Sequence, residues 1–361
     1  MTSGLAPRWA SAPGATIRAI MDERDLGIED LAAALGTPVT EAEALLAGQA
    51  PISADRADRL SLTFGASARF WLTREAEYVE DRFRVMAADW STSLPLSNMR
   101  RFGWIRTPRD WHDQIDQCLT FFGVDDFEEW LDRYPRQARV AHYRTSATFE
   151  NDENATLVWF RAGDLKVRPP QAQRHFDADG LRASLPALKR LTRFANPERF
   201  VPELARIAAN SGLTVRIVPA PDGCRASGTT RWIQGAPVIQ LSARYLSDDH
   251  FWFTFFHEVG HVLCHDKKQE TFIDLDMDTA GDDDLEDEAD RFAESVIFGE
   301  VTNLAELSHG THRDVIHIAA RLGISPGLLV GQLQHRGYVS RDQFNRLKRR
   351  YRWEGTTLVA K

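Results

Sequence analysis

The sequence has few cysteines, no long apolar run and no strong excess of basic charge. Its three cysteines, Cys118, Cys224 and Cys264, lie far apart and match no C-x-x-C metal pattern. This argues against a disulfide framework and favours a reducing compartment. No stretch reaches the roughly 18 apolar residues of a membrane span, and the first residues lack the apolar core of a signal peptide. We therefore expect a cytoplasmic protein without a membrane anchor.

The composition is that of a folded protein with several domains. Apolar residues make up 43% and charged residues 27%, which is the ordinary globular range. The 361 residues predict two or three domains, because a domain holds roughly 100 to 200 residues. The net charge of −8 does not indicate a general binder of polyanions. One segment, Arg341 to Arg352, is basic, and we interpret it as a solvated helix face.

Residues 14–80 are expected to form short amphipathic helices separated by turn residues. Ile28 to Leu35 and Val39 to Leu46 are joined across a short turn that contains Gly36, which is typical of a helix-turn-helix. The order of motifs resembles the N-terminal domain of the Xre-like, HigA-type antitoxin family, in which a glycine-ended recognition helix precedes P-I-S and a later F-W-L.

The charge of this helix pair does not match that resemblance. The recognition helix carries Glu41 and Glu43 and no Arg or Lys, whereas contacts to phosphate and guanine favour basic side chains. DNA binding through the N-terminal domain therefore stays open.

The pattern changes after residue 213. Residues 83–198 are expected to be mainly helical, are rich in Trp and Phe, and show no motif that carries chemistry. The later segments LTVRIVPA, TTRWIQ and PVIQLS combine β-forming residues with turn residues, and they predict a small antiparallel sheet.

The segment FWFTFFHEVGHVLCH contains an H-E-x-x-H motif. His257 and His261 are four residues apart, so on a helix they lie about 40° apart on one face and can bind one ion. Zinc binds neutral imidazole and keeps one position open for water in hydrolytic sites. Glu258 lies about 100° round from His257, where a carboxylate can take a proton from the attacking water. Cys264 is too far along the axis to join easily, and we interpret it as a buried structural thiol.

A catalytic zinc site needs a third protein ligand, and LEDEADRFAESVIF offers two acids. With Ala289 at the centre of the apolar stripe, Glu286 lies about 60° away and Glu288 about 100° away on the other side. We therefore predict Glu286 as the third ligand, with Asp290 on the same side holding the second ring nitrogen of a ligand histidine. His265 and His317 are further candidates for transition-state stabilisation, and the spacing selects neither.

The order F-T-F-F-H-E-V-G-H-V-L-C-H followed by E-D-E-A-D-R-F-A resembles the ImmA/IrrE family of zinc peptidases. In that family an H-E-x-x-H helix is followed by E-x-E-A-N-x-F-A. The resemblance implies that His257, His261 and Glu286 bind zinc and that Glu258 is the catalytic base. The usual Asn is Asp290 here, which keeps a hydrogen-bond acceptor.

These patterns together predict a multidomain fold. It consists of an all-α Xre/HigA-like helix-turn-helix domain at 1–82, a mainly helical linker region at 83–198, an α+β zincin-like metallopeptidase core at 199–310 and a helical C-terminal segment at 311–361. Through VIQLS and GISPGLLVGQLQH, the ImmA/IrrE resemblance extends over most of residues 200–352.

The resemblance implies a zinc-dependent endopeptidase that cleaves a partner protein. The implied partner is a DNA-binding transcriptional repressor, whose cleavage switches on stress, mobile-element or defence genes. Residues 274–290 hold ten acids in seventeen positions. They form either a solvated loop or an acidic rim that favours a basic substrate segment.

The alternative is a non-enzymatic regulator or antitoxin with a helix-turn-helix, whose peptidase-like domain senses a ligand or dimerises. The intact Glu258 favours catalysis, because a site that only binds has no need of a base. Whether the protein is a homodimer stays open.

Overall fold

The structure is a computed structural model that describes residues 9–142, 153–165, 175–233, 235–265, 271–275, 283–299, 304, 307 and 310–361. The chain divides into two compact units. The first consists of Met1–Ser93 with Pro108–Trp130, and the second of Leu94–Thr107 with Leu131–Lys361. The described part is mostly helical and has a small mixed sheet toward the C-terminus, which agrees with the expected combination of a helical part and an α+β part.

The first unit begins with short helices around an apolar core. They are α1 (Pro13–Glu23), α2 (Ile28–Leu35), α3 (Val39–Leu46) and α4 (Ala54–Phe64). The core includes Ile17, Leu31, Leu60 and Trp71, all fully buried. α2 and α3 have the bounds that the sequence predicts, and Gly36 between them has a φ of 62°, a left-handed conformation that glycine adopts without strain.

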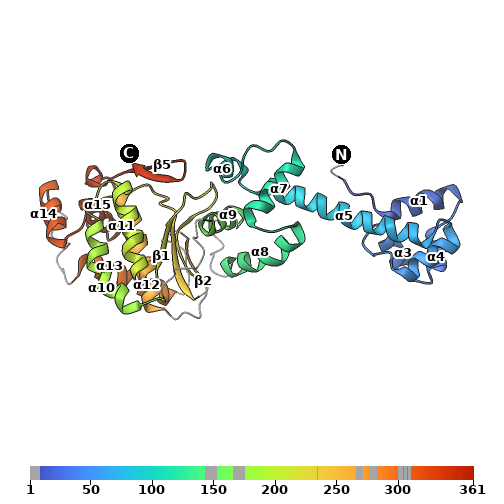
Figure 1. The fold of residues 1–361 in the computed structure, drawn as a ribbon, viewed down its shortest axis with the longest axis horizontal. Helices are drawn as coiled ribbons and strands as arrows, with labels where there is room; N and C mark the ends of the chain where they lie inside the picture. Colours follow the sequence, from blue (N-terminus) through green and yellow to red (C-terminus); the bar gives the residue numbers. More distant parts are fainter. Residues whose placement is uncertain are drawn as a thin grey trace. The chain divides into compact units, whose positions relative to one another are not determined.

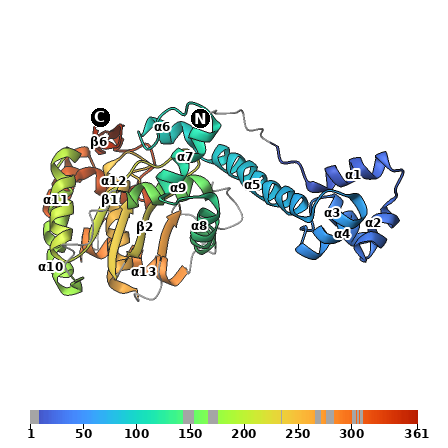
Figure 2. The same ribbon diagram turned by 45° about the vertical axis from the view of Figure 1, so that its right-hand side comes forward.

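A long helix follows these four. α5 (Ala68–Ser93) has 26 residues and continues well beyond the region near residue 80 where the sequence analysis ended it. In Figure 2, α7 (Trp111–Phe122) lies at the other end of α5 from α1 to α4. There Trp90 of α5 contacts the rings of Phe122, Phe127 and Trp130, with centroids 5.8, 5.3 and 4.8 Å away. The last two rings belong to α8 (Phe127–His142).

The second unit is built on a mixed sheet of order β1-β3-β2-β4. Its strands are β1 (Thr214–Ile217), β2 (Ala226–Ile233), β3 (Ala236–Leu241) and β4 (Thr271–Leu275). β2 is antiparallel to β3 and β4, but β1 is parallel to β3. The prediction of a purely antiparallel sheet was therefore wrong. β2 and β3, which follow one another in the chain, pair in opposite directions, and β1 joins the free side of β3 in the same direction as β3.

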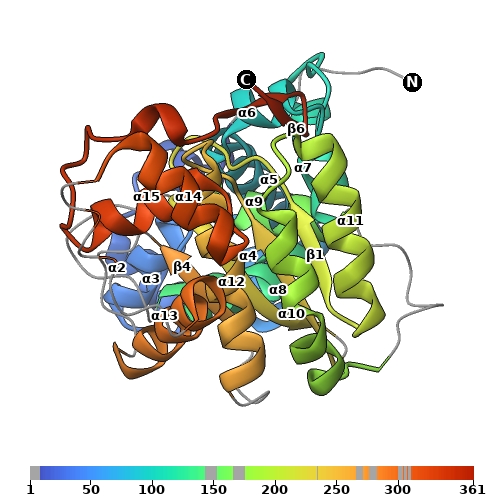
Figure 3. The same cartoon turned by 90° about the vertical axis from the view of Figure 1, so that its left-hand side faces the viewer.

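Further helices belong to the second unit. They are α6 (Leu96–Arg101), α9 (Glu153–Asp164), α10 (Ala178–Leu191), α11 (Pro197–Asn210), α12 (Asp248–Cys264), α13 (Asp283–Phe298), α14 (His312–Leu322) and α15 (Pro326–His335). Figure 1 shows α9 on one side of the sheet and α10 to α13 on the other. Figure 3 shows α10 and α11 side by side next to β1.

The two faces of the sheet have different chemistry. Toward α9, Gln240 Nε2 donates to the carbonyl of Trp159 at 2.7 Å, and Arg216 Nη1 donates to the carbonyl of Gly163 at 2.7 Å. Because side chains alternate along a strand, the neighbours Ile239 and Leu241 face the opposite way, and both belong to the large apolar core around α12.

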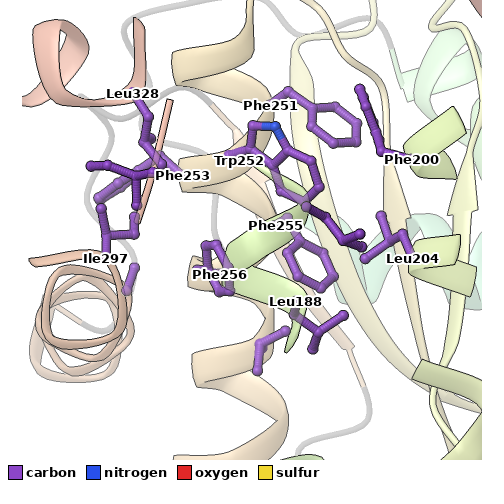
Figure 4. Packing of buried hydrophobic residues seen from close by; sticks show 14 of the residues in the cluster. Leu188, Phe200, Leu204, Phe251, Trp252, Phe253, Phe255, Phe256, Ile297 and Leu328 are labelled. Carbon is purple, nitrogen blue, oxygen red and sulfur yellow. The ribbon is translucent and has the colours of Figure 1, made fainter. Parts of the chain in front are cut away.

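α12 is the central helix of this core. Its residues from Phe251 to Val262 are all buried, as expected for a helix that is apolar on nearly every side. Figure 4 shows Phe251, Trp252 and Phe255 directed toward α11, and Phe253 directed toward Ile297 and Leu328. Polar residues on this helix are therefore held in fixed positions by dense packing.

The C-terminal segment contains helices α14 and α15, but it closes with an antiparallel hairpin of β5 (Tyr351–Glu354) and β6 (Thr357–Ala360) that the sequence analysis did not predict. Among the described residues, no single helix has the length and hydropathy of a membrane span. α14 and α15 meet that criterion only as a pair bent by 108°.

The basic segment Arg341 to Arg352 does not form the α-helix that was predicted, and its solvation is only partial: Arg341, Arg346, Arg350 and Arg352 are exposed, but Lys348 is not. Lys348 Nζ lies 2.5 Å from Asp249 Oδ2, and the two side chains are 9% and 4% exposed. The backbone N–H of Arg349 donates to Asp248 Oδ1 at 2.9 Å. These basic residues attach the C-terminal segment to the first turn of α12, because two buried carboxylates there require partners.

Asp248 and Asp249 respond to this burial in opposite directions. Asp248 is fully buried and also accepts a bond from Ser325 Oγ at 2.8 Å. Burial raises the pKa of Asp248 from 3.8 to about 6. Burial alone would also raise the pKa of Asp249, but the charges of His250 and Lys348 lower it. Ionised Asp248 therefore reduces stability above about pH 6, whereas ionised Asp249 adds to stability.

We expect Asp248→Asn to increase the free energy of unfolding by about 1–3 kcal/mol near pH 8 and to change it little near pH 4. The amide oxygen can still accept from the backbone N–H of Arg349, and the amide NH2 can donate to Ser325 Oγ, so both contacts remain without a buried charge. Asp249→Asn is the matched control and should destabilise the protein near pH 8. Denaturant unfolding followed by circular dichroism measures both effects. An Asp248→Asn effect of the same size at both pH values would contradict this account.

Candidate metal centre

α12 and α13 approach each other closely beside the H-E-x-x-H motif. A Cβ atom added to Gly260 would lie 3.0 Å from Ala289 Cα and 3.1 Å from the Ala289 carbonyl oxygen. Glycine at this position therefore allows the two helices to touch. Glu286 lies nearly one turn before Ala289, so the close contact brings its side chain to the imidazoles of α12.

Three donor atoms converge between the two helices. His257 Nε2 and His261 Nε2 are 2.9 Å apart, and Glu286 Oε2 lies 3.1 Å from the first and 3.5 Å from the second. Ligands bound tetrahedrally to zinc at about 2.0–2.1 Å are about 3.3 Å from one another. The triangle therefore has the size of a zinc ligand set, and it is the group of possible metal ligands found among the described residues.

Asp290 determines which nitrogen of His257 carries the hydrogen. His257 Nδ1 lies 2.7 Å from Asp290 Oδ1, and an ionised carboxylate only accepts hydrogen bonds. His257 Nδ1 is then protonated, and the lone pair of Nε2 points at Glu286. The lone pair of His257 Nε2 and the Glu286 carboxylate oxygen repel each other at this distance unless a cation or a proton lies between them. The sequence analysis expected this position for Asp290.

His261 has a corresponding partner in His265. The two Nδ1 atoms are 2.9 Å apart, and His265 Nε2 lies 3.4 Å from Glu288 Oε2. The structure thus brings Glu286 to the donor atoms, the acid that the helical phase favoured, and it places Glu288 beside His265, which the sequence analysis did not predict. Spacing alone did not select His265. The other candidate, His317, lies on α14 with its side chain exposed.

The protonation states also suit a metal. Burial lowers the pKa of His261 to about 4, so the ring is neutral near pH 7, as a metal ligand must be. Partial burial alone would raise the pKa of Glu286, but the hydrogen bonds and charges of His257 and His261 lower it well below its usual range. Neutral imidazoles and an ionised carboxylate are ligands that zinc prefers.

Glu258 is fully buried between α12 and β2. Its Oε2 accepts a hydrogen bond from Thr230 Oγ1 at 2.6 Å. A Cβ atom added to Gly228 would collide with Glu258 Oε1. Gly228 and Thr230 are two residues apart, so both face α12: the glycine leaves room for the carboxylate, and the threonine holds it on the side of α12 that faces β2.

The sequence analysis missed Gly228 and Thr230. Their importance comes from the position of β2 opposite α12, and no local motif carries this information. The expectation that Cys264 is a buried thiol was wrong, because Cys264 is the last residue of α12 and is exposed. In the acidic stretch, residues 276–282 lie outside the described residues, and Asp284 and Asp287 are exposed on α13.

Residues 211–334 match the family model of the IrrE N-terminal-like domain, Peptidase_M78. The match covers about a third of the chain and includes the four-stranded sheet, α12 and α13. It supports the ImmA/IrrE part of the resemblance and identifies a domain of metallopeptidase type. The match does not include the N-terminal helices, so their Xre/HigA-like character stays a prediction. No curated protein matches the chain.

We expect the purified protein to bind about one zinc ion per chain, in line with three converging ligands. Glu286→Gln should weaken zinc binding by more than the ~10–100-fold typical for loss of an outer-sphere partner, and His261→Ala should empty the site. Competition with a chromogenic chelator measures the affinity. Glu288→Gln is the matched control, on the same helix but outside the triangle. Equal zinc retention in the two Glu variants would refute the ligand assignment.

Proposed function

We propose, on the premise that residues 211–334 form an IrrE-like peptidase domain, that this protein is a zinc-dependent endopeptidase that cleaves a partner protein. One observation carries the proposal. A buried carboxylate that is not part of the donor triangle, Glu258, directly follows a ligand residue and is held by Thr230. A structural zinc site normally uses four protein ligands and needs no base, whereas a catalytic site uses three ligands and leaves one position open.

In this proposal His257, His261 and Glu286 hold the zinc ion. When bound, zinc lowers the pKa of water and polarises a carbonyl group. Glu258 accepts the proton of the water that attacks the peptide carbonyl carbon, and then delivers it to the nitrogen as the C–N bond breaks. Thr230 positions the Glu258 carboxylate for both transfers, and Asp290 and His265 orient the two ligand rings.

The charge near the site favours a basic substrate segment. Glu288, Asp284 and Asp287 are exposed at the start of α13, close in sequence to Glu286. Basic segments that contact DNA phosphates are common in repressors, and they complement an acidic surface. We therefore infer that the substrate is a DNA-binding repressor, whose cleavage switches on stress, mobile-element or defence genes.

The second candidate function is a non-enzymatic helix-turn-helix regulator or antitoxin. The helix pair α2 and α3, with its short turn, supports it. The charge of α3 weakens it, because Glu41 and Glu43 are exposed and would repel phosphate. Glu41 is also engaged by Arg56 at 2.6 Å. Such a regulator would have no use for the buried Glu258.

We expect Glu258→Gln to keep the fold and the zinc content while removing proteolysis, because the amide retains the size of the side chain but accepts no proton. Cells that express wild type or this variant at matched levels should differ in newly formed protein N-termini. Mass spectrometry of labelled N-termini detects them across the whole proteome, so the substrate need not be chosen beforehand.

Two controls make this comparison specific. Asp179→Asn, a substitution of a 96% exposed side chain on α10, should leave the new N-termini in place, whereas the metal-site variant His261→Ala should remove them. A promoter reporter distinguishes the regulator from the peptidase. If wild type and Glu258→Gln regulate the same promoters equally and share all N-termini, the peptidase proposal is wrong.

A further inference from the structure

Exposed apolar side chains on α5 follow a regular spacing. Leu72, Val79 and Met86 are 40%, 40% and 43% exposed and succeed one another every seven residues. Seven residues make almost two helical turns, so these side chains lie along one line of the helix. An apolar line of this kind on the surface of a helix is expected to pack against another structural element.

Two further apolar residues complete a coiled-coil pattern. Ala76 is exposed and Phe83 half-buried, and each follows a member of the first series by four residues. Alternate steps of four and three residues define a coiled-coil seam. We call Leu72, Ala76, Val79, Phe83 and Met86 the α5 stripe. α5 contains neither glycine nor proline, and Figure 2 shows it as one continuous helix.

The α5 stripe ends at Met86, because the next residue in the spacing is buried within the first unit. Trp90 continues the spacing but is 8% exposed, because it packs on Phe127 and Trp130 of α8. The part available to a partner therefore runs from Leu72 to Met86.

We propose that the α5 stripe is the seam of an antiparallel coiled coil between two copies of this chain. A seam of this kind is complementary to itself, so a second copy needs no other surface. In the antiparallel arrangement Leu72 lies opposite Phe83 of the other copy, and Ala76 lies opposite Val79. The small alanine leaves room for the valine side chain and allows the two helices to approach closely.

The charged residues beside the stripe favour the antiparallel arrangement over the parallel one. In a parallel pair, Glu75 would face Glu80 of the other copy across the seam, and like charges would repel. In the antiparallel pair, Glu75 faces Arg82 of the other copy, and symmetry provides this attraction twice. Opposite charges beside a coiled-coil seam set the orientation of its helices.

The length of the seam limits its strength. A segment of about fifteen residues spans only ~22 Å and is expected to bury less than the ~1,200 Å² typical of stable complexes. The dimer should therefore be weak and depend on protein concentration. Because α2 and α3 pack at the start of α5, the antiparallel dimer would carry one α2–α3 pair at each end of the seam. This inference does not depend on the peptidase activity.

Sedimentation equilibrium of the full chain at low salt tests the proposal, over roughly 1–200 µM, where an interface of this size should dissociate. Wild type should show a monomer–dimer equilibrium. Arg82→Glu should weaken dimerisation about tenfold, because two attractive pairs become repulsive. The double variant Glu75→Arg/Arg82→Glu should restore it. Glu77→Arg, a charge reversal on the outer face of α5, should have little effect.

The charge variants also distinguish an antiparallel dimer from a parallel one. In a parallel dimer, Glu75→Arg alone would strengthen association, because the introduced arginine would face Glu80, and this result would overturn the antiparallel assignment. A chain that stays monomeric over the whole concentration range would overturn the proposal. The charge variants lie on the helix surface, and thermal melts verify that they fold.

Discussion

The close packing of α13 on α12 at Gly260 and Ala289 is the contact on which the site depends. Even one added carbon at Gly260 would press on the backbone of α13, and the two helices would have to separate. Glu286 would then move away from His257 and His261, with which it now forms a triangle of 2.9, 3.1 and 3.5 Å. Burial of α12 on all sides keeps its own half of the triangle in place.

The same packing separates metal binding from acid–base chemistry. The ligand residues face α13, whereas Glu258 faces β2 and is held there by Thr230. A carboxylate held on the sheet is kept from becoming a fourth ligand, so one position at the metal can stay open. The sheet thus contributes to the site through the residues that face α12, and its other face packs against α9.

Local patterns in the sequence predicted most helices and the three side chains that converge between α12 and α13, but not the other contacts between elements. The turn residues around Gly36 predicted where α2 ends and α3 begins. The phase of the apolar stripe around Ala289 favoured Glu286 over Glu288 as the acid near the two histidines. The parallel pairing of β1 with β3, the role of Thr230 and the burial of Lys348 against Asp249 all depend on residues distant in sequence. The basic run before β5 was predicted to be solvated because the sequence alone does not show that it contacts the buried carboxylates of α12.

The most direct test of the central claim is a crystal structure of the zinc-loaded protein, with anomalous diffraction recorded above and below the zinc absorption edge. The account predicts one strong zinc peak about 2.0–2.2 Å from His257 Nε2, His261 Nε2 and a Glu286 oxygen, with the Glu258 carboxylate still on Thr230 and outside the coordination sphere. A peak elsewhere, or a zinc ion ligated by Glu258, would contradict it.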